Sequence, residues 1–476
     1  MTKRTIEHES PRYFRASSGA AAAPVPNSPP EALPQRIFST AFGIALRPRT
    51  ANDAFEVCHD DVSAAKKKYY TIIKTGFLIP GDGEPVANAA LVVENKIIVW
   101  VGPAAELPEE YTDASHRFFE IPYLMPGLWE VHSHFGGESP NEESSSYVAF
   151  VATHPASAGA RLTKGCWEAL QRGYTSLRDV AGLGCEVAKA VDDGSIVGPN
   201  IYSSGAGLTQ LAGHGDIHDL PAGDVINNLG VKNVQAGHWG TGSTLIADGV
   251  DECRRAVRLQ IRRGAKCIKI MASGGVMSRD DNPLYAQFSK EELETIVEES
   301  NRQGRSVAAH VHGKPGILAA VNAGVTTVEH VSFADQECID LIKEKGTIYV
   351  ATRFIVDMLI QTGGKGLSKP QWEKAKDTPP GFNCAIELEY AVKCGLSNLE
   401  AIKAATANGP LTVGAQAPKT GQLKAGYEAD IIGLLENPVD DVKVLQNKDN
   451  IKYVFKGGKL FKGPGVGPWG EDYVLE

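Results

Sequence analysis

The chain has 476 residues, of which 42% are hydrophobic and 22% charged, as in ordinary globular proteins. Its net charge of −9, with no basic block, argues against nucleic acid or an anionic membrane surface as a partner. The eight cysteines include no Cys-x-x-Cys pair, which argues against a disulfide scaffold and a thiolate zinc site. Scattered thiols, no apolar run of about 18 residues and no secretory signal pattern predict a cytoplasmic protein without a membrane segment.

The N-terminal part of the chain differs in texture from the rest. Residues 1–65 contain the segment AAAAPVPNSPPEALP and little periodic apolar pattern, so we expect a disordered or loosely attached arm. From Tyr69 the chain is rich in β-forming residues separated by turn residues, as in YTIIKTGFLIP, ALVVENKIIVWVG and RFFEIP. This pattern predicts a small antiparallel sheet. The tail has the same texture in GQLKAGYEADIIGLLENP and IKYVFKGGKLFKG.

The middle of the chain, from Tyr123 onward, alternates strand-like with helix-like runs. One helical run opens with a capping box, Ser289-x-x-Glu292, and ends at Gly304. The alternation predicts a parallel sheet with helical crossovers, and its length favours an eight-stranded (β/α) barrel. The strands that we expect are LWEVHSH, YTSLRDVA, PNIYSSG, KCIKIMAS, SVAAHVHG, TTVEHV and TIYVAT.

The stretch YLMPGLWEVHSHFGG, residues 123–137, carries the first functional signal. If its apolar run is a strand, the period of two places His132 and His134 on one face at the carboxyl end. Barrels hold metals with side chains at this end of their strands. Further candidates stand in the later runs KCIKIMASGG, VAAHVHG, TTVEHVS and KDTPPG, namely Lys269, His310, His330 and Asp377.

With this set of motifs, residues 70 to 476 resemble the metal-dependent amidohydrolase superfamily, and within it the ochratoxinase and Xaa-Pro dipeptidase-like amidases. The resemblance implies a barrel over residues 122–417 beside a β-sandwich built from residues 66–121 and 418–476. It also implies two divalent metal ions, with zinc expected. The implied ligands are His132, His134 and Asp377 for one metal, His310 and His330 for the other, and a carboxylated Lys269 as the bridge.

Lys269 has a physical argument of its own. It lies in the apolar run Cys267–Met271, where an unpaired ammonium group is costly and where desolvation favours the reactive neutral amine. The alternative is a lysine whose side chain extends from the strand edge to water. Two more histidines are candidate substrate-binding residues: His214 in the glycine-flanked loop AGHGD, and His312 two residues after His310. For His312, a surface or loop position is the alternative.

The pattern breaks before Asp377, which lies only 47 positions after His330. The residues just before it, WEKAK, have helical rather than strand texture. The sequence therefore predicts that the eighth strand is missing or damaged within residues 352–382. An open barrel would leave the edges of its first and seventh strands unpaired inside the protein, with several backbone groups lacking hydrogen-bond partners.

The favoured function is a binuclear metal-dependent amidase that cleaves an N-acyl amino acid or dipeptide-like substrate. The resemblance suggests an amide of the ochratoxin A type, from which phenylalanine is released, with Asp377 carrying the proton. A deaminase or cyclic-amide hydrolase of the same superfamily is one alternative, and a non-catalytic scaffold is another. The expected partners are a small-molecule amide and further copies of the chain in a homo-oligomer, with no nucleic acid and no membrane.

Overall fold

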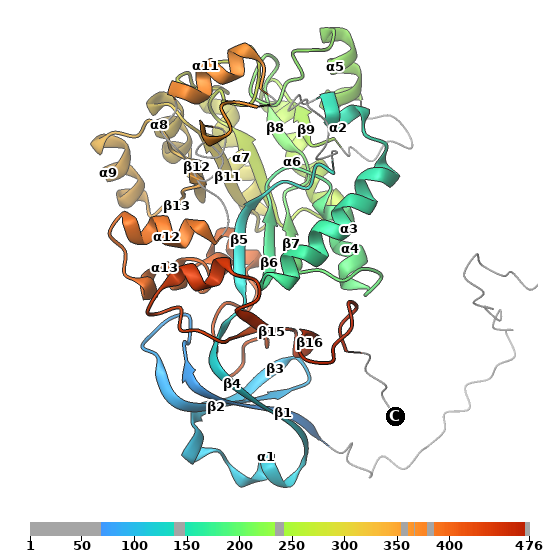
Figure 1. Ribbon diagram of the computed structural model, residues 1–476. Helices are drawn as coiled ribbons and strands as arrows, with labels where there is room; N and C mark the ends of the chain where they lie inside the picture. The colour runs from blue at the N-terminus through green and yellow to red at the C-terminus, as the bar shows by residue number, and fades with distance from the viewer. Residues whose placement is uncertain are drawn as a thin grey trace, which may run out of the picture. The chain divides into compact units, whose positions relative to one another are not determined.

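In a computed structural model of the protein, the described residues are 68–137, 148–233, 242–353, 360–365, 367–377 and 385–471 (Figure 1). Contacts divide the chain into a unit of residues 1–66 and a unit of residues 67–476, and every described residue belongs to the second unit. The arm expected over residues 1–65 lies outside the described residues. Among the helices of the described part, none is both long and apolar enough to cross a bilayer.

Strands from both ends of this unit form one seven-stranded sheet, in the order β16-β15-β14-β4-β1-β2-β3. This joining of the two ends confirms one part of the prediction. The expected all-antiparallel pairing is wrong at one place, because β1 and β4 are parallel. The sheet topology of the described residues does not confirm the expected β-sandwich. The strands are Tyr69–Leu78, Val86–Glu94, Ile97–Pro103 and Ser115–Pro126 (β1 to β4), and Ile431–Leu434, Ile451–Lys456 and Lys459–Lys462 (β14 to β16).

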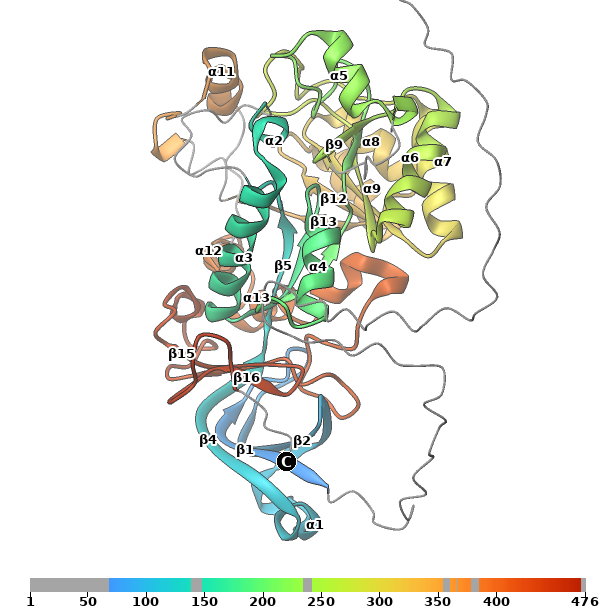
Figure 2. The same ribbon diagram turned by 90° about the vertical axis from the view of Figure 1, so that its right-hand side faces the viewer.

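The chain passes from β4 directly into β5, Leu128–Ser133, which begins the parallel part of the fold (Figures 1 and 2). Gly127 stands at this junction. A Cβ atom there would lie 2.2 Å from Oγ1 of Thr175 on the neighbouring strand, so only glycine lets the two strands approach. The Pro-Gly break seen in the sequence therefore marks the passage from one sheet to the next.

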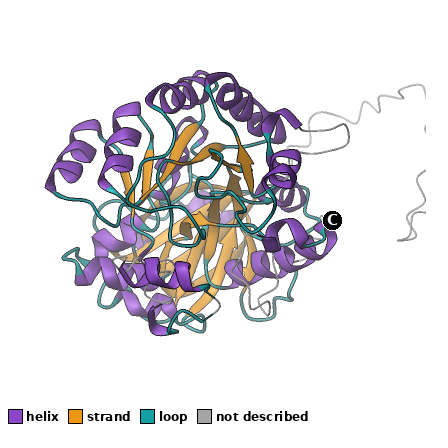
Figure 3. Cartoon of the chain, turned by 90° about the horizontal axis from the view of Figure 1, so that it is seen from above, coloured by secondary structure: helices purple, strands orange, loops and turns teal. Residues whose placement is uncertain are grey.

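The parallel strands form two sheets, β5-β6-β7 and β13-β12-β11-β10-β8-β9. All seven strands expected from the sequence are present. Two strands of three residues each, β8 and β9, were not expected. Seen from above, helices surround the strands (Figure 3). The strands after β5 are Tyr174–Asp179 (β6), Asn200–Ser203 (β7), Gly207–Thr209 (β8), Thr244–Ile246 (β9), Cys267–Met271 (β10), Ser306–Val311 (β11), Thr327–His330 (β12) and Ile348–Val350 (β13).

The helices have the expected crossover pattern. The capping box of α7 forms, with Ser289 Oγ accepting from the Glu292 amide. The largest apolar core lies between β10, β11 and β12 and their helices, where Ile268, Ile270 and Val328 are fully buried. The helices are Glu109–Asp113 (α1), Val148–Ala152 (α2), Pro155–Gln171 (α3), Gly184–Asp192 (α4), Ala222–Leu229 (α5), Val250–Arg263 (α6), Lys290–Arg302 (α7), Lys314–Ala323 (α8), Gln336–Lys345 (α9), Lys369–Asp377 (α11), Ile386–Lys393 (α12) and Asn398–Ala404 (α13).

The barrel is not closed among the described residues, because β5 and β13 each end a sheet. A cavity of about 440 Å³ is lined by residues of these two strands and of α12 and α13. The edge of β5 finds other hydrogen-bond partners: the Trp129 amide donates to Ala405 O (2.8 Å), and the His132 amide to Glu130 Oε1 (2.9 Å). Lys369–Asp377 is helical, as its sequence predicts. The domain boundaries at 66, 122 and 418 stay predictions.

The cavity leads to a testable prediction about stability. Ala401 of α13 lines it and is 1% exposed, so Ala401→Leu places apolar atoms in empty space. We expect a gain of about 0.5–2 kcal/mol in the free energy of unfolding, measured by urea denaturation. The matched control is Ala320→Leu in the tightly packed core of α8, where overpacking should cost about 1–3 kcal/mol. An equal loss in both variants would contradict an accessible cavity.

Candidate metal centre

The predicted histidines meet at the carboxyl ends of the parallel strands, as the barrel pattern requires. The set comprises His132 and His134 at the end of β5, His214 after β8, His310 and His312 at the end of β11, and His330 as the last residue of β12. His330 has φ +73°, so the backbone leaves the extended conformation at this residue. The sequence periodicity therefore correctly indicated which strand ends share one space.

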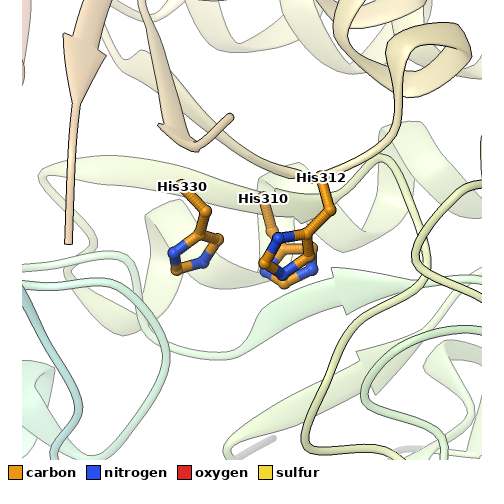
Figure 4. Close-up of side chains that lie close together, drawn as sticks. All are labelled: His310, His312 and His330. Atoms are coloured by element: carbon orange, nitrogen blue, oxygen red, sulfur yellow. The ribbon is translucent and has the colours of Figure 1, made fainter. Parts of the chain in front are cut away.

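The closest group in this set is His310, His312 and His330, each of which offers a ring nitrogen within 4.8 Å of the others (Figure 4). The ring centroids of His330 and His132 are 4.9 Å apart, and those of His132 and His134 are 5.2 Å apart. The imidazoles thus form one continuous cluster. His312 was expected beside the substrate, whereas its nitrogen lies among those of the predicted ligands.

Burial keeps these imidazoles neutral. Desolvation lowers the pKa of His132 to about 4, and those of His134 and His312 to about 3. The same cause holds the pKa values of His310 and His330 well below the ordinary value. A neutral ring nitrogen with a lone pair is the form that binds metal ions. At neutral pH the cluster therefore presents ligands rather than cations.

Hydrogen bonds fix which nitrogen carries the lone pair in two of these rings. The Nδ1 atom of His134 lies 3.2 Å from Ala181 O, and a carbonyl oxygen only accepts. The Nδ1 atom of His132 lies 2.7 Å from the Glu329 carboxylate. Both neutral rings therefore donate from Nδ1, and their Nε2 atoms carry no hydrogen.

Glu329 belongs to a buried network that sequence reasoning missed. Arg178 of β6 donates to both of its carboxylate oxygens, at 2.8 and 3.0 Å, and both side chains are fully buried. Burial alone would raise the pKa of Glu329, but the charge of Arg178 and the bond from His132 hold it far below the ordinary value. The one signal in the sequence was an acidic residue inside the apolar run TTVEHV.

Lys269 lies in β10 and is fully enclosed by the protein. It is 1% exposed, and its Nζ atom has no hydrogen-bond partner in the described part of the structure. Desolvation lowers the pKa of Lys269 to about 8, which increases the fraction of neutral amine. The alternative, a lysine whose side chain extends to water, is therefore wrong.

The two remaining candidates differ in what the structure says of them. The His214 ring stacks on that of His310, with centroids 4.2 Å apart and an interplanar angle of 21°. Asp377 is the last residue of α11, a helix rather than a barrel strand, and its side chain is outside what the structure describes. The structure therefore brings His214 into the cluster and leaves the position of the Asp377 carboxylate open.

Comparison with known proteins gives relatives along most of the chain. The Amidohydrolase family matches residues 123–368 and 373–461. Ochratoxinase of Aspergillus niger is 57% identical over 436 residues, which cover 86% of this chain and 90% of the relative. Imidazolonepropionase of Nocardia farcinica is 23% identical over 73% of this chain and 85% of its own length.

Two solved structures are similar to this chain in fold. The crystal structure of A. niger ochratoxinase aligns with a TM-score of 0.80, covering 85% of this chain and 98% of that one at 57% identity. A prolidase complexed with N-methylphosphonate-L-proline aligns with a TM-score of 0.70 at 27% identity, covering 83% and 100%. These matches and the histidine cluster lead to one conclusion: the chain belongs to the amidohydrolase family, as a hydrolytic enzyme that acts on C–N bonds.

Proposed function

We propose that the chain is a binuclear metal-dependent amidase that releases an amino acid from an N-acyl amino acid or dipeptide-like substrate. The observation that carries this proposal is the cluster of buried, neutral imidazoles together with Lys269, whose buried Nζ atom has no hydrogen-bond partner among the described residues. A cluster that served packing alone would not require a lysine without a partner in such a place.

The donor set fits two zinc ions. His132 and His134 would hold one ion and His310 and His330 the other, with Lys269 between them and His312 offering a further nitrogen. Borderline metals such as zinc favour imidazole and carboxylate ligands. When bound, two such ions activate a water molecule and polarise the carbonyl of the amide. Hydrogen bonds from Nδ1 to Glu329 and to Ala181 O fix the orientation of the His132 and His134 rings, in which Nε2 carries no hydrogen.

Lys269 would complete the site as a carbamate. The neutral amine attacks carbon dioxide, the new N–C bond replaces one C–O π bond, and one proton leaves, so that a neutral amine becomes an anionic carbamate. The lowered pKa of Lys269 supports this step because it favours the neutral amine. The product supplies the negative charge that two adjacent cations require, in a place where the described residues offer the Nζ atom no hydrogen bond.

The proposed substrate class comes from the relatives. An ochratoxinase at 57% identity supports an aromatic acyl-phenylalanine amide of the ochratoxin A type. The prolidase structure holds a ligand that ends in proline, which supports a free carboxylate next to the scissile bond. Asp377 is the proposed proton carrier to the leaving amine, and the family likeness supports a barrel with a β-sandwich beside it.

One observation favours a second candidate, a non-catalytic scaffold. Residues 369–377 are helical, so Asp377 does not follow a barrel strand, and β5 and β13 do not pair with a described strand between them. The complete histidine set favours the enzyme. Hydrolysis of N-benzoyl-L-phenylalanine by the purified chain decides between them, since a scaffold gives no turnover above that of a His310→Ala variant.

The role of Lys269 is tested by Lys269→Ala. The loss of a residue that only supports a metal ligand lowers kcat/KM by roughly 10–100-fold. Because Lys269 is proposed to be a ligand itself, we expect a larger fall in Lys269→Ala. Short carboxylic acids with bicarbonate should restore part of the activity, because a free carboxylate can occupy the space of the carbamate. Lys266→Ala, at the exposed position just before β10, is the control and should retain full activity. No loss in Lys269→Ala, or no difference from the control, would refute the bridging role.

The substrate class is tested with N-benzoyl-L-phenylalanine against its methyl ester and its amide. A site that binds a free carboxylate should lose at least about tenfold in kcat/KM, or about 1.4 kcal/mol, when that charge is blocked. Equal rates for all three compounds would overturn this part of the proposal and leave the hydrolytic activity itself intact.

A further inference from the structure

The cavity between β5 and β13 shares a wall with the histidine cluster. Its volume of about 440 Å³ lies within the range of about 300–1,000 Å³ that is usual for ligand sites. His132, a proposed metal ligand, lines the cavity. Thr352 lines it too, and the Thr352 hydroxyl group forms a hydrogen bond with Nδ1 of His330. One small molecule can therefore contact both the cavity and the metal centre.

The lining of the cavity is mainly apolar. Small side chains on and next to α12 and α13 leave the space open, namely those of Ala391, Ala401, Ala404 and Ala405. Aromatic and branched side chains form other parts of the wall, namely those of Trp129, Tyr174, Tyr349, Leu388 and Tyr390. Such a surface favours an aromatic or branched apolar group, because apolar area is then removed from water.

Arg353 places a positive charge in this wall, a short way beyond the end of β13. The residue before it, Thr352, has φ +45°, a conformation that β-branched residues rarely adopt. At this turn the Thr352 hydroxyl contacts His330, while the Arg353 side chain lines the cavity. Strained backbone of this kind is concentrated at functional sites. The turn thus brings a cation next to the proposed metal ligands.

The acidic residues of the lining leave this positive charge largely uncompensated by a full negative charge from α12. Burial and the charge of Glu130 raise the pKa of Glu387 to about 9, and the charge of Arg353 lowers it by less. At neutral pH the Glu387 carboxyl group is therefore mostly protonated and competes weakly for a guanidinium group. Glu130, a second acidic residue in the lining, accepts the His132 amide at 2.9 Å. A guanidinium group binds a carboxylate through two parallel hydrogen bonds, so the cavity suits a molecule with a carboxylate and an apolar body.

We propose that Arg353 binds the free carboxylate of the substrate and that the cavity holds the apolar side chain of the same amino acid. This inference deepens the proposed function and rests on it, because the scissile amide must lie at the metal centre while both contacts form. Arg353 then selects substrates with a carboxylate, and the alanines of α12 and α13 select amino acids with a large side chain.

Exchange of Arg353 tests the contact with the carboxylate. In Arg353→Gln, kcat/KM for N-benzoyl-L-phenylalanine should fall by at least about tenfold, because a hydrogen-bonded charge pair is lost. The amide of this compound has no carboxylate and should lose much less, so that the acid-to-amide ratio of kcat/KM falls. Arg353→Lys keeps the charge and should retain part of this ratio.

The matched control for this exchange is Lys403→Gln on α13. The Lys403 Nζ atom pairs with Asp82 Oδ1 at 2.6 Å, away from the cavity lining, so this variant also removes one positive charge. It should keep the acid-to-amide ratio of the wild type. An active enzyme whose ratio is the same in Arg353→Gln as in Lys403→Gln would overturn the proposal.

Ala401→Leu tests the apolar part of the cavity. The larger side chain should lower kcat/KM for N-benzoyl-L-phenylalanine relative to N-benzoylglycine, which has no side chain, by at least about tenfold. Because the same variant should be at least as stable as the wild type, unfolding would not explain this loss. An unchanged preference for the phenylalanine compound would place the substrate side chain elsewhere and contradict this half of the proposal.

Calorimetric titration with L-phenylalanine gives a readout that needs no turnover. Arg353→Gln should bind L-phenylalanine at least about tenfold more weakly than the wild type. Crystals soaked with L-phenylalanine should show the ring in the cavity and the carboxylate at Arg353, and a ring outside the cavity would overturn the proposal. An inactive wild type with this binding pattern would contradict the proposed amidase alone. An active enzyme whose binding is equal in Arg353→Gln would contradict this inference alone.

Discussion

The fold around the site depends on one buried ion pair, Arg178 with Glu329. Arg178 comes from the three-stranded parallel sheet and Glu329 from the six-stranded one, so the pair connects two sheets that do not close into a barrel among the described residues. Arg178 also donates to Val131 O of β5, and Glu329 accepts from His132. Removing one partner of such a pair costs about 3–5 kcal/mol, because the other charge is left buried and alone. The same pair thus joins the sheets and orients the His132 ring.

Much of this fold could be predicted from the sequence, because long apolar periods and helix caps are local signals. The alternation of strands and helices, the capping box at Ser289 and the order of the histidines are all visible in residue spacing. Strands of three residues such as β8 carry too short a pattern to be recognised. Arg178, Ser278 and Asp281 were missed because only folding brings them close to the histidine cluster. A single polar residue in the sequence does not by itself indicate a functional role.

In the region before Asp377, the prediction of local structure was more accurate than the prediction of tertiary contacts. Helical texture in residues 371–376 correctly predicted α11, since it depends on neighbouring residues. The expectation of unpaired edges was only partly correct, because Ala405 O and the Glu130 side chain accept amides of β5. The open edge therefore borders a cavity, and α11 contacts the loop after β10, which lies against His214. The sequence of one segment alone cannot predict such a replacement of hydrogen-bond partners, because it depends on contacts between distant segments.

The central claim is that the buried imidazoles and Lys269 form a two-metal site, and metal analysis of active crystals tests it most directly. Protein purified without chelator should contain two zinc ions per chain by elemental analysis. Anomalous diffraction at the zinc edge should place one ion at His132 and His134 and the other at His310 and His330, with a carboxylated Lys269 between them. One ion or fewer per fully active chain, or ions bound away from these residues, would contradict the account.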